Sequence, residues 1–118
     1  MKESGSSRVG LLQGTLDVLI LRTLIPGAAH GHAIATHIRR TSRDVLRVEA
    51  GSLYPALHRL EAKGWIAASW AHSEKGKRAK YYRLTRRGRT QLAAEQSRWQ
   101  EFVRAMARIL APAPEGGR

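Results

Sequence analysis

The segment GSLYPALHRLEAKGWI, residues 51–66, constrains the fold more than any other because it specifies a short helix with both ends marked. Ser52 is placed to cap the start, and Pro55 falls in the first turn, where a missing N–H costs no hydrogen bond. Gly64 suits the left-handed position that follows a last helical turn. The core-facing side is formed by Leu53, Leu57, Leu60 and Gly64. The pattern predicts a short surface helix with one buried face.

Two earlier segments also predict helices. In GTLDVLILRTLIPG, Thr15 is a candidate N-cap, and Asp17 falls in a first turn where its charge complements the helix dipole. Apolar residues surround nearly this whole helix until Pro26 and Gly27 stop it, so we expect it to be central and buried. The second helix spans roughly residues 31–41 and is expected to turn four side chains inward: Ala33, Ile34, His37 and Ile38.

After Gly64 the apolar period changes from helical to alternating, which is typical of strands. One face of the first strand carries Ile66, Ala68, Trp70 and His72, and one face of the second carries Tyr82 and Leu84. The polar stretch SEKGKRAK lies between them, so the pattern predicts a β-hairpin with a basic tip. We expect Trp65 and Trp70 to pack this hairpin onto the helices.

A long helix is predicted from about residue 86 to residue 110. At roughly 1.5 Å per residue it is nearly 40 Å long, longer than the small domain to which it belongs. Its apolar stripe therefore needs a second partner, and we expect a homodimer. The predicted interface consists of Leu92, Trp99, Phe102, Val103, Met106, Ile109 and Leu110. Trp99 opens the stripe, so its ring is either an ordinary interface anchor or a contact for a small aromatic effector.

Three short helices followed by a basic two-stranded hairpin predict a winged helix-turn-helix. The expected fold class is mainly α (α+β), with a two-stranded β wing and a long C-terminal dimerisation helix. A chain of 118 residues is long enough for one such domain. We expect the winged helix-turn-helix at residues 11–85, the dimerisation helix at residues 86–111, and flexible ends at residues 1–10 and 112–118.

The charge balance narrows the choice of partner. Lysine and arginine number 21 against 9 acidic residues, which gives a formal charge of +12. An excess of this size favours a polyanionic partner, nucleic acid before an anionic membrane. The chain has no cysteine, which excludes disulfides and thiolate metal sites. With no signal-peptide pattern and no apolar run long enough to span a bilayer, we expect a soluble cytoplasmic protein that does not enter membranes.

The helix within residues 51–66 occupies the recognition position of the predicted fold, which enters the major groove of DNA. Arg59 can donate two parallel hydrogen bonds to a guanine edge. The predicted contacts of this helix are Ser52, Tyr54, Pro55, Ala56, His58 and Arg59. Basic residues of the wing and of the second helix are expected on the phosphate backbone or in the minor groove: Lys75, Lys77, Arg78, Lys80, Arg39 and Arg40.

Other functions fit some of the same features. A capped amphipathic helix with outward cations is often only a surface helix, so a non-specific basic architectural or RNA-binding protein and a protein-interaction module stay open as alternatives. His30, His32 and His37 form no facing pair at i, i+4 within one helix, so neither a metal site nor another cofactor is expected. The sequence has no nucleophile elbow, no Gly-rich phosphate loop and no spaced carboxylate pair, so we do not expect an enzyme.

Four stretches resemble the PadR family of bacterial transcriptional regulators, particularly its short members with one C-terminal helix. They are LLQGTLDVLILRTL, HGHAIATHI, GSLYPALHRLEAKGWI and AKYYRLTRRGRTQL, and the resemblance covers about residues 11–105. It implies a homodimeric winged-helix repressor whose C-terminal helices form most of the interface and which often responds to small aromatic or other ligands. We therefore expect two recognition helices to enter successive major grooves of a pseudo-palindromic double-stranded DNA operator, roughly 34 Å apart.

Overall fold

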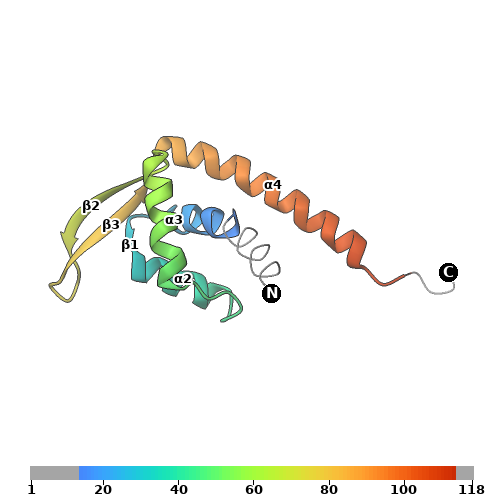
Figure 1. The fold of residues 1–118 in the computed structure, drawn as a ribbon, viewed down its shortest axis with the longest axis horizontal. Coiled ribbons are helices and arrows are strands. Elements are labelled where there is room, and N and C mark those ends of the chain that lie inside the picture. Colours follow the sequence, from blue (N-terminus) through green and yellow to red (C-terminus); the bar gives the residue numbers. More distant parts are fainter. Residues whose placement is uncertain (1–13, 114–118) are drawn as a thin grey trace.

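The computed structural model describes residues 14–113. Within that range a helical core carries a small antiparallel sheet at one side, and a long helix leaves it toward the other (Figure 1). The elements are an N-terminal helix that includes residues 14–23, β1 (Ala29–His30), α2 (Gly31–Thr41), α3 (Ala50–Ala62), β2 (Ile66–His72), β3 (Arg78–Leu84) and α4 (Arg86–Leu110). The predicted fold class, mainly α with a β wing, is confirmed.

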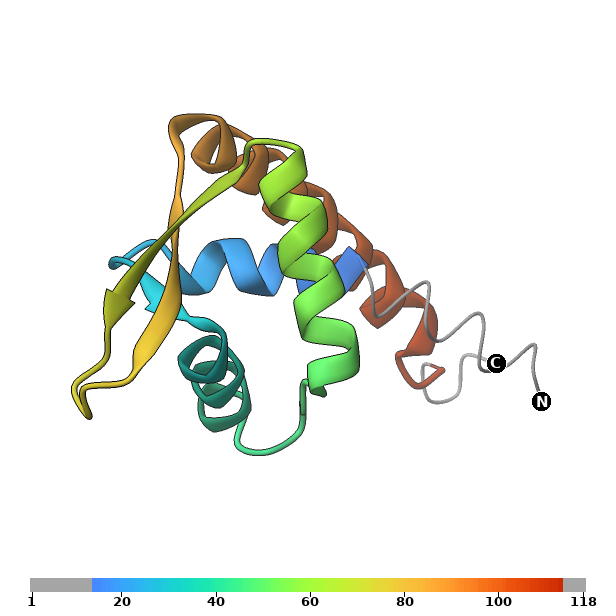
Figure 2. The ribbon, with the colours of Figure 1, turned by 60° about the vertical axis from the view of Figure 1, so that its left-hand side comes forward.

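The core forms where the N-terminal helix, α2 and α3 meet the base of the sheet. Figure 2 shows α3 crossing in front of the N-terminal helix, whose buried position was expected from its all-round apolar surface. The largest fully buried side chains are Ile20, Leu21, Leu24, Ile34, Leu57, Leu60 and Ile66. Thr15 lies inside the helix, which already includes Gly14, so the prediction that Thr15 is its N-cap is wrong.

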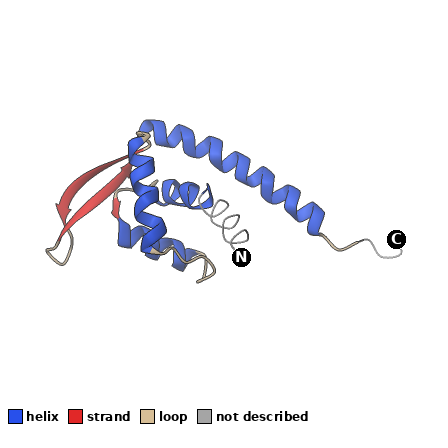
Figure 3. Ribbon diagram, viewed as in Figure 1, coloured by secondary structure: helices blue, strands red, loops and turns tan. Residues whose placement is uncertain are grey.

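The hairpin is confirmed, with β2 and β3 antiparallel in the register Ile66↔Leu84 (Figure 3). The sheet has a third strand, β1, in the order β1-β3-β2. Ala29 pairs with Tyr82 in this strand. The sequence does not predict a strand at residues 29 and 30, because a strand of two residues is too short to show an alternating pattern. The extra strand connects the start of α2 to the hairpin.

The start of α3 differs from the prediction. The helix begins at Ala50 with Glu49 as its N-cap residue, so Ser52 lies inside the first turn and does not cap it. Pro55 consequently lies beyond the first turn. It has no N–H to donate to the carbonyl of Gly51, and Gly51 is exposed. The other end agrees with the prediction: Gly64 has a φ of 78°, and Trp65 N–H donates to the Leu60 carbonyl at 3.1 Å.

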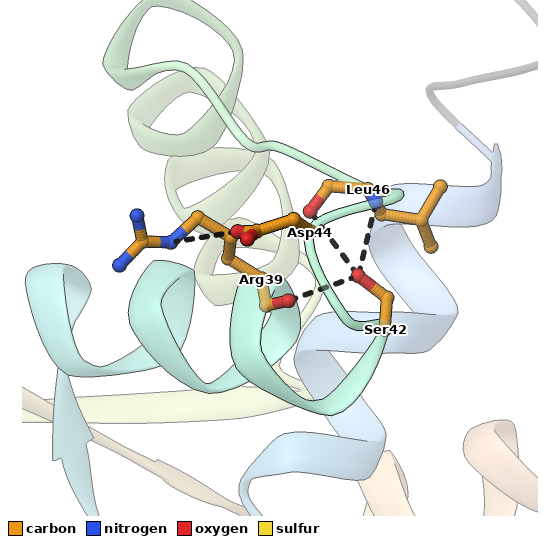
Figure 4. Close-up of polar contacts among 4 residues, drawn as sticks. All are labelled: Arg39, Ser42, Asp44 and Leu46. Atoms are coloured by element: carbon orange, nitrogen blue, oxygen red, sulfur yellow. Dashed lines mark hydrogen bonds and ion pairs between the residues drawn. The ribbon is translucent and has the colours of Figure 1, made fainter.

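A side-chain network shapes the turn between α2 and α3 (Figure 4). The Ser42 hydroxyl donates to the Arg39 carbonyl at 3.1 Å and accepts from Leu46 N–H at 2.9 Å. Asp44 has a φ of 66°, a left-handed conformation that aspartate tolerates better than most residues, and its carboxylate lies 3.8 Å from Arg39 Nε. On α2 itself, the prediction that His37 points inward is wrong, since His37 is exposed and lies 3.3 Å from the Thr41 hydroxyl.

Thr85 fixes the direction in which α4 leaves the domain. Its hydroxyl accepts from Gly88 N–H at 3.0 Å, which caps α4, and donates to the Gly64 carbonyl at 2.8 Å. Its own N–H donates to the Trp65 carbonyl at 3.1 Å. Gly88 is buried against that same carbonyl. The end of α3 and the start of α4 are therefore joined rigidly, and α4 points away from the hairpin tip (Figure 1).

Replacing Gly88 with alanine tests this junction. A Cβ atom at residue 88 would collide with the backbone carbonyl of Trp65, which cannot move without separating α3 from α4. We expect Gly88→Ala to lower the free energy of unfolding by about 2 kcal/mol or more, measured by urea denaturation. Gly27→Ala is the control, because a Cβ there meets nothing within 4 Å; it should change stability by less than about 0.5 kcal/mol. Equal effects would contradict this description of the junction.

Candidate nucleic-acid interface

The exposed face of α3 carries four of the six residues predicted to contact DNA. Ser52, Tyr54, Pro55 and His58 are exposed. The Tyr54 ring rests against Gly31 at the start of α2, where an added Cβ would lie 2.8 Å from the Tyr54 hydroxyl. A glycine at residue 31 therefore leaves the space that the Tyr54 ring occupies beside the start of α2.

Ala56 does not belong to this face. It is 1% exposed, so the prediction that it points away from the core is wrong. The physical reason is helical spacing, because residues 53, 56, 57 and 60 follow the i, i+3, i+4, i+7 pattern of one buried stripe. Alanine at residue 56 allows α3 to approach the core closely.

Arg59 also differs from its predicted orientation. Its guanidinium forms an ion pair with Asp17 of the N-terminal helix, with Nη2 2.7 Å from Oδ1, and the two side chains are 29% and 18% exposed. The prediction of an outward guanidinium aimed at a guanine edge is therefore not what the structure shows. Asp17 was assigned to the helix dipole, and a sequence offers no signal that pairs two residues 42 positions apart. The ion pair holds α3 against the N-terminal helix.

The predicted basic contacts are largely exposed. Arg39, Arg40, Lys75, Lys77 and Arg78 are exposed. Lys80 is half-buried, and its Nζ lies 3.4 Å from Glu61 Oε1 on α3. This ion pair connects the middle of the wing to the C-terminal part of α3.

Trp65 and Trp70 have different environments. Trp65 is half-buried against the core, as expected. Trp70 is 55% exposed, so the prediction that it packs the hairpin onto the helices is wrong. The guanidinium carbon of Arg78 lies 4.2 Å from the Trp70 ring centroid, within the range of a cation–π contact. Trp70 lies two residues after Ala68 on the same face of the strand, which places it past the end of the core. Its distance along the strand was therefore the sign that it would be exposed.

The wing and α3 face each other across a groove of about 540 Å³. On the α3 side it is lined by Tyr54 and His58, and on the wing side by Trp70, Lys77 and Arg78. Tyr82 lies at its base, where burial raises the pKa of the phenol, although the nearby Lys80 ammonium acts in the opposite direction. Among the described residues that line this groove, none is acidic. The groove is therefore aromatic and cationic, which suits an anionic ligand.

The apolar stripe of α4 is exposed beyond its first turns. The residues with large exposed side chains are Phe102, Val103, Met106, Ile109 and Leu110. Trp99 is half-buried and its ring centroid lies 5.4 Å from that of Phe102. Leu92 is the exception: it is 4% exposed and part of its own subunit's core, so its assignment to a dimer interface is wrong.

Residues 14–113 contain neither of two other kinds of site. No group of three or more histidine, aspartate or glutamate side chains in this range is arranged to hold a metal ion. His30 instead accepts a hydrogen bond from Ala33 N–H at 3.1 Å and so caps α2, while His32 stacks beside it at 6.3 Å. No helix in the described part of the chain combines the length and apolar character needed to cross a bilayer.

One family model and several known proteins match this chain. The family model described as the transcriptional regulator PadR-like family matches residues 20–94. An uncharacterised protein of Lysinibacillus sphaericus is 30% identical over 94 residues, which covers 80% of this chain and 86% of that protein. A PadR family transcriptional regulator from Eggerthella lenta is 31% identical with a TM-score of 0.72, covering 93% of this chain and 95% of the other. A transcriptional regulator from Clostridium thermocellum is 27% identical with a TM-score of 0.77, covering 86% of this chain and 98% of the other.

A double-mutant cycle tests whether the Asp17–Arg59 ion pair stabilises the fold. Asp17→Asn should lower the free energy of unfolding by about 1–2 kcal/mol, because the pair is mostly shielded from water. Asp17→Asn with Arg59→Gln should cost clearly less than the sum of the single changes, measured by urea denaturation. The control cycle is Glu95 with Arg98, which also lie 2.7 Å apart but leave Arg98 63% exposed; its coupling should be below about 0.5 kcal/mol. Equal coupling in both cycles would contradict the role given to Arg59.

Proposed function

The chain belongs to the PadR-like family of transcriptional regulators, and from this premise we propose that it is a sequence-specific repressor that binds operator DNA as a homodimer in the cytoplasm. Regulation through DNA binding follows from membership of the family; the repressor role, the dimer and the operator are the proposal. No catalytic activity is part of it.

Sequence-specific DNA binding is supported by one observation: the exposed face of α3 and the cationic face of the wing line one groove. A helix of this kind enters the major groove, where side chains distinguish base edges. Since Arg59 is paired with Asp17, we propose that Ser52, Tyr54 and His58 contact the bases in its place. Lys75 and Lys77 in the wing, with Arg39 and Arg40 at the end of α2, are proposed to contact phosphates.

The observation that supports a homodimer is the unpartnered apolar face of α4. Phe102, Val103 and Met106 are between 40% and 46% exposed, and Ile109 and Leu110 more than 70%. Pairing two such helices about a two-fold axis would bury this stripe and place two α3 helices on one side of the dimer. The operator would then be pseudo-palindromic, with half-sites roughly 34 Å apart.

An effector-dependent change belongs to the same proposal. The rings of Trp99 and Phe102 lie on the proposed dimer interface, where a flat aromatic molecule can stack. A ligand that favoured a different spacing of the two winged helix-turn-helix domains would relieve repression, because it would stabilise the state of the dimer that fits the operator less well.

Selection of binding sites from a random duplex pool tests sequence-specific reading. The unaltered protein should enrich a two-fold symmetric site. His58→Ala should lose about 1–3 kcal/mol of discrimination at one base position of each half-site and keep the others. His37→Ala is the matched control, because His37 is exposed on α2 but does not line the groove. A uniform loss of affinity without a change in preference would favour a non-specific architectural protein, and no salt-dependent DNA binding would favour a protein-interaction module.

A charge placed in the α4 stripe tests the homodimer. Val103→Glu should raise the dimer dissociation constant on the order of a hundredfold, because the carboxylate would be buried without a partner. Gln100→Glu introduces the same charge at an exposed position outside the stripe and should leave the dimer intact. Sedimentation equilibrium measures both. A monomeric unaltered protein, or equal effects of the two changes, would contradict the proposed interface.

A further inference from the structure

Three of the five histidines line the groove between α3 and the wing: His30, His32 and His58. His30 and His32 lie at the start of α2 with their ring centroids 6.3 Å apart, and His58 lies on the exposed face of α3. Histidine is the side chain whose charge ordinarily changes between pH 5 and pH 8. The groove therefore gathers groups that can respond to pH.

His30 already uses one ring nitrogen to hold the fold. Its Nδ1 accepts a hydrogen bond from Ala33 N–H at 3.1 Å, which caps α2, and its ring meets the Tyr81 ring edge-on at a centroid distance of 5.4 Å. A proton on Nδ1 would remove this acceptor and would place a positive charge at a helix N-terminus, where the helix dipole opposes it. His30 is therefore not among the groups that we expect to gain a proton.

The rings of His32 and His58 have no such role. Both side chains are exposed, and within residues 14–113 no hydrogen bond or ion pair engages either ring. A neutral imidazole offers one donor and one acceptor, whereas the protonated ring offers two donors and a positive charge. These two rings can therefore gain a proton without breaking any hydrogen bond of the fold.

Few negative charges face these two rings in the free protein. The cations that line the groove or the cavities beside it are Arg59, Lys75, Lys77, Arg78 and Lys80. The phenols there are Tyr54, Tyr81 and Tyr82. Glu74 lines the cavity beside His32, whereas the carboxylates of Asp17 and Glu61 are paired with Arg59 and Lys80. The remaining histidine of the wing, His72, ends β2 and does not line the groove.

Double-stranded DNA supplies the missing negative charge. It carries one phosphate charge per about 1.7 Å of helix axis, and its major groove presents acceptors such as guanine N7 and O6. Negative charge close to an imidazole favours the protonated ring. We propose that His32 and His58 each gain a proton when the duplex binds, so that affinity for the operator is coupled to pH. This inference rests on the proposed function, because it assumes that the exposed face of α3 meets DNA.

The sign of the coupling follows from the direction of proton transfer. Since the complex holds more protons than its separate parts, the added affinity is present at low pH and is lost as pH rises. The proposed repressor would then hold its operator more tightly when the surrounding solution becomes more acidic. Its occupancy of the promoter would respond to pH without a small-molecule effector.

Titration of DNA at fixed salt and different pH values measures the coupling. The slope of log K against pH, with its sign reversed, equals the number of protons taken up, and two rings in each of two subunits allow up to about four per dimer. From pH 8 to pH 6 we expect the affinity of the unaltered protein to rise on the order of a hundredfold. Calorimetry in two buffers of different ionisation enthalpy counts the same protons independently.

Glutamine variants assign the protons to residues, because glutamine is polar and stays neutral at every pH. His32→Gln and His58→Gln should each lower the number of protons taken up by about half, and the double variant should bind with almost no pH dependence. His37→Gln is the matched control, since His37 is exposed on α2 but does not line the groove, and it should keep the full number. Thermal unfolding of each variant at both pH values separates loss of coupling from loss of fold.

The outcomes separate this inference from the proposed function. If the unaltered protein binds DNA with a salt dependence but takes up no protons, or if the double variant takes up as many as the unaltered protein, the inference is overturned and the proposed function stands. A full proton count in one single variant overturns the assignment of that ring. If the unaltered protein shows no salt-dependent DNA binding at either pH, both are overturned.

Discussion

The burial of the hairpin base against α3 is the constraint on which the rest of the proposed DNA-binding face depends. Ile66, Leu84 and Tyr82 are at most 9% exposed, so the face of the hairpin that packs on the helices is fixed. Because side chains alternate strictly along a strand, a one-residue slip would turn the whole apolar set to solvent. The same alternation places Trp70 and Arg78 on the α3 side. The burial of the hairpin base therefore also sets the orientation of the wing.

Two ion pairs reinforce this arrangement, and each one uses a basic residue that the sequence analysis had assigned to DNA. Asp17 engages Arg59, and Glu61 engages Lys80, so each pair connects α3 to a neighbouring element. In a chain with a formal charge of +12, the few acidic residues near the DNA-binding face thus hold its geometry, while cations such as Lys77 and Arg78 stay exposed. In the proposed function, different basic residues hold the geometry and bind DNA, although all of them look alike in the sequence.

Local patterns predicted most of the fold. The bounds of α2, the hairpin and α4 were predicted closely because each has a clear period and clear ends, and Gly64 ends α3 as expected. Errors arose where the outcome depends on contacts distant in sequence. Arg59 was expected to face DNA, and only the packed structure brings Asp17 beside it. Ala56 is a different case, because its spacing to Leu53 and Leu60 already places it in the buried stripe of α3. Leu92 was misplaced because one apolar residue near the start of a long helix does not show whether it packs inside its own subunit.

Hydroxyl-radical footprinting of the protein on its selected duplex is the most direct measurement of the central claim that two copies of α3 and its wing face one duplex from the same side. The account predicts two protected segments on each strand, related by two-fold symmetry and about one helical turn apart, with protection extending into the flanking minor grooves. Continuous protection without symmetry, or protection that stops at the major-groove half-sites, would contradict it.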